Sequence, residues 1–207
     1  MNLSPFYLFL RNRQVMWLPC ALTLYAALLL VLPVHNTAVP FRFDVANNVL
    51  VVVGLLPAIA VPYLSASPMP ALEAAASGRV RTTWVLGLLL LHYLLWAAVA
   101  GALMWNPTFP VGLADQLVRN TTLAVGLGFL AMVWTPREVA WLPGTFALCV
   151  TWMFGTTGPE AASRVWSIAT YPPHSILAWS VTAVIAGGAL VSLSCARRTW
   201  GTPDFAQ

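Results

Sequence analysis

The residues that could carry out chemistry are few and scattered. The chain contains three histidines and three cysteines: His35, His92, His174, Cys20, Cys149 and Cys195. No two histidines stand at the i, i+4 spacing of a zinc site, and the cysteines show no C-x-x-C spacing. We therefore expect no metal site, and we expect the cysteines to be small buried hydrophobic residues.

His92 is the histidine that lies inside a long apolar segment, where polar residues are expensive and often functional. A single histidine at such a depth more often forms a hydrogen bond to a neighbouring helix than binds a metal. Haem ligation by two histidines would require His92 to meet His35 or His174, whose expected depths in the membrane differ. The sequence therefore favours a hydrogen-bonding role for His92.

Signatures of common catalytic sites are also missing from the sequence. It contains no G-x-S-x-G nucleophile elbow, no paired-Glu motif of a membrane prenyl-protein protease and no Arg/His-rich phosphate clamp of a lipid phosphatase. A G-x-x-x-x-G-K-[ST] phosphate loop is impossible, because all ten basic residues are Arg. The chain therefore does not bind ATP by that route.

The composition explains why candidates are so few. Of the 207 residues, 59% are hydrophobic and 8% are charged, and the mean hydropathy is +0.78. Soluble domains carry roughly 25% charged residues. Ten basic and six acidic residues cannot form the polar shell of a soluble domain. This composition excludes an ordinary cytosolic enzyme, a disordered tail and a secreted disulfide scaffold, and it indicates an integral membrane protein.

Six apolar segments approach the length of about 20 residues that crosses the hydrocarbon core of a bilayer. They are expected at residues 16–34, 47–66, 83–105, 120–136, 139–156 and 174–195. We therefore predict an all-α integral membrane protein with a single transmembrane domain over residues 1–207. Pro136 predicts a tight turn between the fourth and fifth segments.

The arginines predict the orientation of these segments. With a cytoplasmic N-terminus, seven arginines fall on the inner side and three on the outer side. The inner ones are Arg11, Arg13, Arg79, Arg81, Arg137, Arg197 and Arg198, and the outer ones are Arg42, Arg119 and Arg164. Because basic residues accumulate in cytoplasmic loops, we expect both termini in the cytoplasm of a bacterial plasma membrane. This topology also explains the net charge of +4 without a nucleic acid partner.

Three shorter helices are expected outside these spans. Residues 3–13 are apolar, end in two arginines and predict an interfacial helix along the inner leaflet. The inner segment 65–83 opens with two prolines and continues as Ala-Leu-Glu-Ala-Ala-Ala-Ser-Gly, which predicts a short helix that stops at Gly78. Residues 160–169 predict a short amphipathic helix at the outer interface.

The order of these elements resembles the permease subunits of type-2 ABC exporters. Such subunits have an elbow helix, six membrane helices, a coupling helix between the second and third, and re-entrant helices between the fifth and sixth. The most specific likeness lies in Ser67-Pro-Met-Pro-Ala-Leu-Glu73 and the following Gly78-Arg-Val-Arg81. These residues are similar to the coupling-helix region of small actinobacterial-type permeases.

The resemblance implies a transport component and not an enzyme. Two permease copies or paralogues would pair in the membrane lipid, and separate nucleotide-binding ATPase subunits would bind ATP and Mg, so that this chain holds no cofactor itself. The implied coupling residues are Pro68, Leu72, Glu73, Arg79 and Arg81. The apolar spans favour a hydrophobic or amphipathic substrate, such as a lipid, a peptide or a drug.

Two other functions remain open. The chain could be a non-transporting membrane subunit that anchors or assembles a larger complex, which its scarcity of intramembrane polar groups would also suit. It could instead be an intramembrane enzyme that uses His92 or Glu73. A co-purifying ATPase favours the permease, another co-purifying protein favours the anchor, and retained activity without a partner favours the enzyme.

The predicted topology can be tested by labelling single cysteines introduced in a background that lacks Cys20, Cys149 and Cys195. We expect a cysteine at Ser77 to be shielded from an impermeant reagent added outside the cell, because this position is predicted to be cytoplasmic. A cysteine at Ser163 is expected to react. The reverse pattern of labelling would show that the orientation is wrong.

Overall fold

The computed structural model describes residues 11, 15–31, 45–65, 78–104, 112–155 and 165–195. All regular elements within these ranges are helices. They are α2 (Leu18–Val31), which follows the 3-10 turn η1 (Val15–Trp17), α3 (Val45–Ser65), α5 (Gly78–Met104), α6 (Leu113–Ala131), η2 (Arg137–Val139), α7 (Leu142–Phe154), η4 (Val165–Thr170) and α8 (Ile176–Cys195). The predicted all-α class is confirmed for the described residues.

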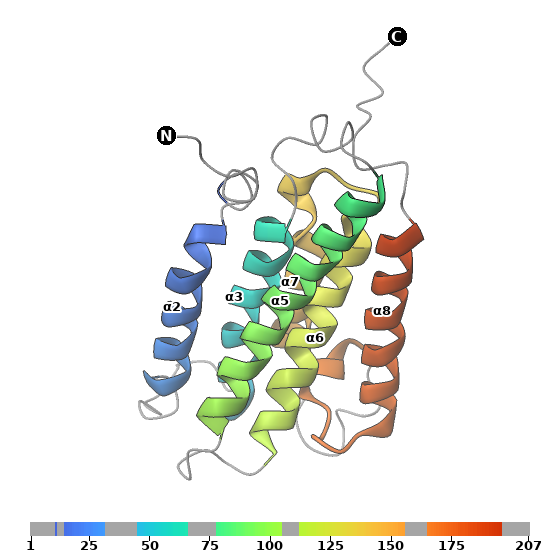
Figure 1. Cartoon of the computed structure of the whole chain (residues 1–207). Coiled ribbons are helices and arrows are strands. Elements are labelled where there is room, and N and C mark those ends of the chain that lie inside the picture. Colours follow the sequence, from blue (N-terminus) through green and yellow to red (C-terminus); the bar gives the residue numbers. More distant parts are fainter. Residues whose placement is uncertain are drawn as a thin grey trace.

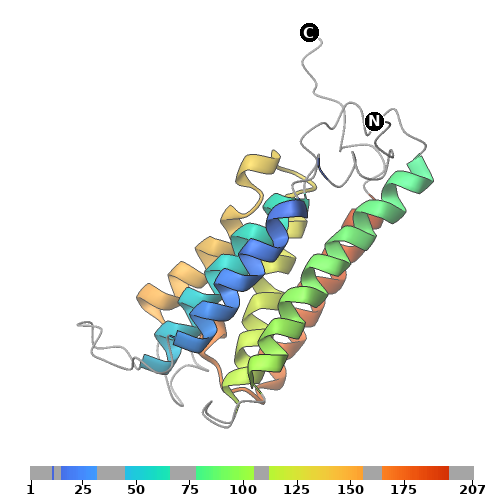
Figure 2. The ribbon, with the colours of Figure 1, turned by 60° about the vertical axis from the view of Figure 1, so that its left-hand side comes forward.

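The long helices run alternately up and down in one bundle (Figure 1). The starts of α2, α5 and α7 lie at the same end as the ends of α3, α6 and α8. We call this end the inner end and the opposite one the outer end, after the predicted topology. The turned view in Figure 2 separates a layer of α2, α3 and α7 from a layer of α5, α6 and α8. Helix α6 is central, because it packs against α3, α5, α7 and α8.

Each of the six predicted spans overlaps one of the helices α2, α3, α5, α6, α7 and α8. The predicted start of the fourth span is wrong, and this error concerns Arg119. The fourth span was expected to start at residue 120, whereas α6 begins at Leu113. Arg119, which was expected in an outer loop, therefore lies inside a helix. Gly78, which was expected to end a preceding short helix, is the first residue of α5.

Two of the described helices are long and apolar enough to cross a membrane. They are Thr83–Leu103, within α5, and Ile176–Cys195, both with a mean hydropathy of 2.0. Shorter apolar helices cover Val15–Val31, Val53–Ser65 and Leu142–Phe154. Length and composition alone therefore support two membrane spans, and α6 fails this test because its first turns carry polar residues.

The core is built from large side chains on several helices. Trp96 of α5 and Tyr25 of α2 are both fully buried, and their rings meet edge to face with centroids 4.6 Å apart. Leu89 and Val125 belong to the same cluster. Aromatic pairs of this geometry stabilise a core beyond the area that they bury. This contact fixes α2, the outlying helix of Figure 1, against α5.

The sides of the bundle are apolar and carry no charge among the described side chains. Large exposed hydrophobic residues occur on five helices: Leu24 and Leu30 on α2, Ile59 and Tyr63 on α3, Leu90 and Leu94 on α5, Phe146 and Met153 on α7, and Val184 and Val191 on α8. The exposed charged residues whose side chains are described, Arg11, Asp115 and Glu138, lie towards the ends. Soluble monomers rarely expose apolar surface of this extent.

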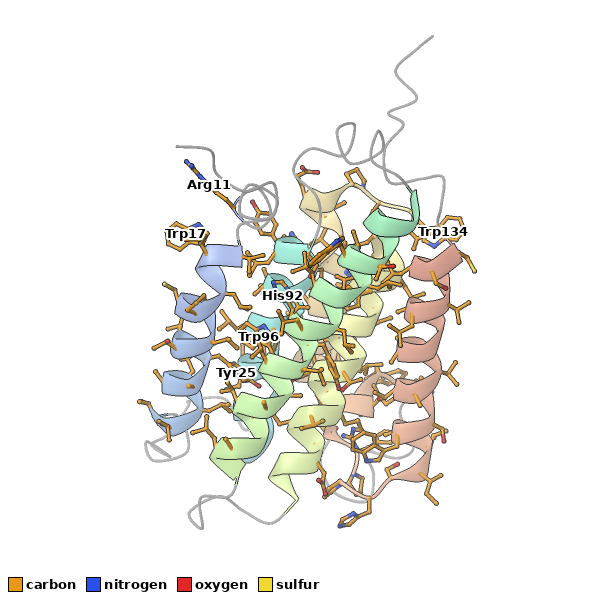
Figure 3. The ribbon with its side chains drawn as sticks, in the orientation of Figure 1. Arg11, Trp17, Tyr25, His92, Trp96 and Trp134 are labelled. Carbon is orange, nitrogen blue, oxygen red and sulfur yellow. The ribbon has the colours of Figure 1, made fainter. Side chains whose placement is uncertain are left out.

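Exposed tryptophans mark both ends of the bundle. Trp17 and Trp134 are 64% and 83% exposed, and they lie at the same level near the inner end on opposite sides of the bundle (Figure 3). Trp166 and Trp179 are exposed near the outer end. Tryptophan is enriched where the headgroups of a bilayer meet its hydrocarbon core, so this arrangement is typical of an aromatic belt.

The crossing of α6 and α7 depends on Gly144. A Cβ atom at this position would overlap with the main-chain oxygen of Ala124, which cannot move aside as a side chain can. We expect Gly144→Ala to lower the melting temperature, since overpacking costs about 1–3 kcal/mol. The control is Gly187→Ala on α8, where a Cβ atom meets nothing within 4 Å. Thermal unfolding in mild detergent measures both, and equal melting temperatures would contradict the close helix crossing.

Candidate functional site

The most polar part of the described interior is a group on α6 near the outer end, which we call the α6 clamp. It consists of Gln116, Arg119 and Asn120, whose spacing of i, i+3 and i+4 places them on one face of the helix. Arg119 is only 1% exposed and Asn120 is fully buried. A buried arginine is rare unless its donors are satisfied.

The α6 clamp binds the segment between α7 and α8, residues 165–175, which we call the return segment. This segment comprises η4 and the turn that follows it. Ser167, Ala169, Thr170 and Tyr171 are buried, whereas Val165 and Trp166 are exposed, so one side of the segment packs into the bundle. Much of its backbone is not α-helical and therefore needs hydrogen-bond partners from elsewhere.

Arg119 supplies most of these partners. Its Nη1 donates to the carbonyl oxygen of Pro172 at 2.9 Å, and its Nη2 donates to that of Tyr171 at 2.9 Å. Longer bonds from Nη2 reach the carbonyl oxygens of Ala169 at 3.2 Å and Ile168 at 3.3 Å. One guanidinium group thus donates hydrogen bonds to four of the five main-chain carbonyls of residues 168–172.

The neighbouring amides complete the α6 clamp. Asn120 Nδ2 donates to the carbonyl oxygen of Ala169, and Gln116 Nε2 donates to that of Tyr171, both at 2.8 Å. The Oδ1 atom of Asn120 accepts weaker bonds of 3.4 Å from Nε and Nη2 of Arg119. The α6 clamp therefore recognises the path of the backbone and not particular side chains of the return segment.

The positive charge of Arg119 is attracted by the carbonyl groups at the end of η4. The last carbonyls of a helix lack partners within it and carry partial negative charge. Every acceptor that Arg119 reaches among the described residues is a carbonyl oxygen. Arginine suits this task, because it presents five N–H donors in a fixed planar fork and keeps its charge.

Further hydrogen bonds fasten the return segment to its flanking helices. Thr151 of α7 donates its hydroxyl to the carbonyl oxygen of Trp166 at 2.7 Å, and the Trp166 indole donates to that of Phe154 at 3.0 Å. Trp179 of α8 donates to the carbonyl oxygen of Pro173 at 2.8 Å. The return segment is therefore bound from α6, α7 and α8 together.

A second polar group lies in the middle of the bundle, and we call it the central cluster. It consists of Tyr25, His92, Trp96 and Thr121, which are all buried. Figure 3 shows His92, Trp96 and Tyr25 one above another between α2 and α5. Nδ1 of His92 lies 2.6 Å from the carbonyl oxygen of Leu88, one turn earlier in the same helix. Since a carbonyl only accepts, Nδ1 carries the proton.

Beside the central cluster, a direct hydrogen bond joins α5 to α6. The hydroxyl groups of Tyr93 and Thr122 lie 2.6 Å apart, and Thr122 donates to the carbonyl oxygen of Val118 at 2.6 Å. Tyr93 therefore donates its proton to Thr122. Bonds of this kind between helices help to fix their packing where the surroundings are apolar.

The coupling residues implied by the family resemblance are not tested by the structure. Pro68, Leu72 and Glu73 lie outside the described residues. Arg79 and Arg81 lie in the first turn of α5 at the inner end, and their side chains are not described. Their proposed role in docking an ATPase therefore stays a prediction.

The expectation of buried cysteines is wrong for two of the three. Cys20 on α2 and Cys195 on α8 are exposed, and Cys149 on α7 is half-buried. An uncharged thiol is compatible with the apolar sides of these helices. Among the described residues, no three His, Cys, Asp or Glu side chains gather where they could hold a metal ion.

Sequence reasoning missed the α6 clamp, although a signal was present. Gln116, Arg119 and Asn120 follow one another at helical spacing directly before an apolar run, a pattern that fits a helix start as well as a loop. The main-chain acceptors cannot be recognised from the sequence, because every residue has a carbonyl oxygen.

We compared the chain with protein families, curated proteins and solved structures, and it matches none of them.

Replacing Arg119 tests the α6 clamp. We expect Arg119→Met to reduce the free energy of unfolding by ~2–4 kcal/mol, since buried acceptors that lose their donor cost about 1–3 kcal/mol each. Arg119→Lys is expected to restore only part of this loss, because an ammonium group cannot reach all four carbonyls. Thermal unfolding and proteolysis of the return segment measure the effect.

Arg11→Met is the matched control for this experiment, because Arg11 is exposed. It should leave the melting temperature and the protease sensitivity close to those of the parent. An Arg119→Met protein as stable as the parent would show that Arg119 does not hold the return segment.

Proposed function

We propose that α2, α3, α5, α6, α7 and α8 all cross a bacterial plasma membrane, with both chain termini in the cytoplasm. The uncharged apolar sides of the described bundle support this proposal, since they suit hydrocarbon and not water. The exposed tryptophans support it further, because Trp17 and Trp134 lie at one level near the inner end (Figure 3) and Trp166 and Trp179 are exposed on elements of the outer end, as expected for the two interfaces of a bilayer.

The shortness of α7 is compatible with this arrangement. Its 13 residues extend about 20 Å, less than the hydrocarbon core of about 30 Å. The return segment follows α7 and packs against its last turns. Irregular backbone is tolerated at membrane depth only where the protein itself satisfies its polar groups. Arg119, Asn120 and Gln116 satisfy them here.

Within this membrane topology, we propose that the chain is a permease subunit of an ATP-driven exporter. The observation that carries the proposal is the return segment, whose buried side packs into the bundle between the fifth and sixth helices. Permeases of type-2 ABC exporters have re-entrant helices at this place in their order of elements. Interrupted helices are also frequent at the substrate sites of transporters.

The proposed exporter contains two permease copies and separate ATPase subunits. Large side chains fill the interior of the described bundle, with Trp96, Tyr25 and Leu148 all at most 1% exposed. A substrate pathway therefore runs between two permease chains and not through one. The apolar lateral surface favours a hydrophobic or amphipathic substrate, such as a lipid, a peptide or a drug.

The alternative is a non-transporting subunit that anchors a larger membrane complex. The same filled interior favours this alternative, because an anchor needs a stable bundle and no pathway. The two proposals differ in their partner at the inner end. An exporter requires an ATPase that contacts the segment between α3 and α5, whereas an anchor does not.

Substitution of Glu73 tests the coupling role. Truncating one partner of a buried charged contact at an interface costs about 2–5 kcal/mol. We therefore expect Glu73→Ala to weaken binding of the co-purified ATPase and to reduce its substrate-stimulated ATP hydrolysis in nanodiscs. Expression and the melting temperature of the chain should stay close to those of the parent.

Glu138→Ala is the matched control, since Glu138 is an exposed acid at the same inner end of the bundle. It should leave ATPase binding unchanged. The helix-breaking Ala74→Pro should act like Glu73→Ala. If both changes in this segment leave ATPase binding and hydrolysis intact, the segment is not a coupling helix and the anchor becomes the better assignment.

A further inference from the structure

The central cluster contains polar atoms that the described residues leave without a hydrogen bond. The hydroxyl groups of Tyr25 and Thr121 and the indole N–H of Trp96 are each shielded from solvent and lack a partner. They come from α2, α6 and α5. More than nine in ten buried polar groups in proteins have a hydrogen-bond partner, so three exceptions on neighbouring side chains require an explanation.

The side chains of Tyr25 and Thr121 are adjacent, but neither hydroxyl group forms a hydrogen bond of standard geometry with a described residue. The ring of Trp96 packs against the ring of Tyr25 at 4.6 Å. Tyr25 of α2 is therefore a neighbour of both Trp96 of α5 and Thr121 of α6.

A second tyrosine–threonine pair, Tyr93 and Thr122, serves as a comparison because its hydroxyl groups are hydrogen-bonded to each other. Tyr93 and Thr122 bond directly at 2.6 Å. Thr121 and Thr122 are consecutive residues of α6, and each faces a tyrosine of a different helix. A tyrosine and a threonine are therefore adjacent twice in this bundle, once with a direct hydrogen bond and once without a bond of standard geometry.

We propose that Tyr25, Trp96 and Thr121 bind one hydroxyl oxygen, supplied by an internal water molecule or by the head of an amphipathic alcohol. The donor and acceptor inventory fits this group. The indole only donates, whereas the two side-chain hydroxyls can donate or accept. A hydroxyl oxygen accepts two bonds and donates one, and buried water typically makes about three.

This site does not depend on the proposed permease function. It requires only the described packing of α2, α5 and α6, which an anchor subunit would share. The aromatic rings and the neighbouring Leu29 and Leu89 form an apolar surrounding, in which a hydrogen bond to the bound oxygen is stronger than in water. An apolar molecule without an oxygen atom would leave the three polar groups unsatisfied.

Removing single oxygen atoms tests the site. If an oxygen is bound, Tyr25→Phe and Thr121→Val each remove one of its partners, and the melting temperature of the full chain in nanodiscs falls by about 2–4 °C. If the hydroxyls are unpaired, the same changes leave the melting temperature unchanged or raise it, because a buried group without a partner is removed.

A second measurement follows magnetisation transfer from water to the Trp96 indole proton by NMR. The full chain carries ¹⁵N-labelled tryptophan, and Trp96→Phe identifies the signal. The site predicts either transfer from water or, after addition of 1-decanol, a shift of the Trp96 resonance. Decane serves as the probe without an oxygen atom and should have no effect.

The two sources of oxygen give different signals. Transfer from water that persists with 1-decanol identifies a water molecule, and loss of this transfer together with a decanol-induced shift identifies an alcohol head. Tyr25→Phe should abolish either signal. The control Tyr93→Phe should lower the melting temperature through its direct bond to Thr122 but preserve the signal at Trp96.

The proposal is overturned if the parent shows neither transfer from water nor a decanol shift at Trp96. It is also overturned if Tyr25→Phe is as stable as the parent or leaves the Trp96 signal intact. None of these outcomes depends on ATPase binding, so the experiments test the proposed site and the proposed permease function independently.

Discussion

The fold depends on one constraint, the need to pair the backbone of the return segment inside an apolar bundle. Arg119 meets this need by donating to the carbonyls of Ile168, Ala169, Tyr171 and Pro172. A polar group without a partner in such surroundings costs several kcal/mol. A neutral donor would pair one or two of these carbonyls, whereas a guanidinium group pairs four and places its charge against aligned dipoles.

This constraint also bears on the helices around the return segment. The segment packs beside the last turns of α7, which ends at Phe154 after 13 residues. The close crossing at Gly144 brings α7 onto the main chain of α6 at Ala124, so that α6 and α7 hold the return segment from adjacent positions. Thr151 adds a hydrogen bond from the α7 side. The polar start of α6 is therefore needed for the apolar helices around it to pack.

The sequence predicts the six helices well, because long apolar runs are visible without any knowledge of their neighbours. It fails at the start of α6, where hydropathy treats Arg119 as a loop residue although its acceptors lie 49 to 53 positions later. Main-chain acceptors have no residue type that a pattern could show. The meeting of Tyr25, Trp96 and Thr121 is equally invisible, since it depends on how three helices are rotated. The implied coupling residues stay a prediction, because they lie outside the described side chains.

Helix α6 is where these features converge. Its outer part binds the return segment, its middle carries Thr121 and Thr122 towards two tyrosines, and its inner end turns directly into η2 and α7. In the proposed membrane location, hydrophobic burial does not distinguish one helix rotation from another, because lipid is as apolar as a neighbouring helix. Polar contacts and close packing then select the arrangement. A rotation of α6 would break the contacts of the α6 clamp and the Tyr93–Thr122 bond together, and for this reason α6 and the return segment act as one structural unit.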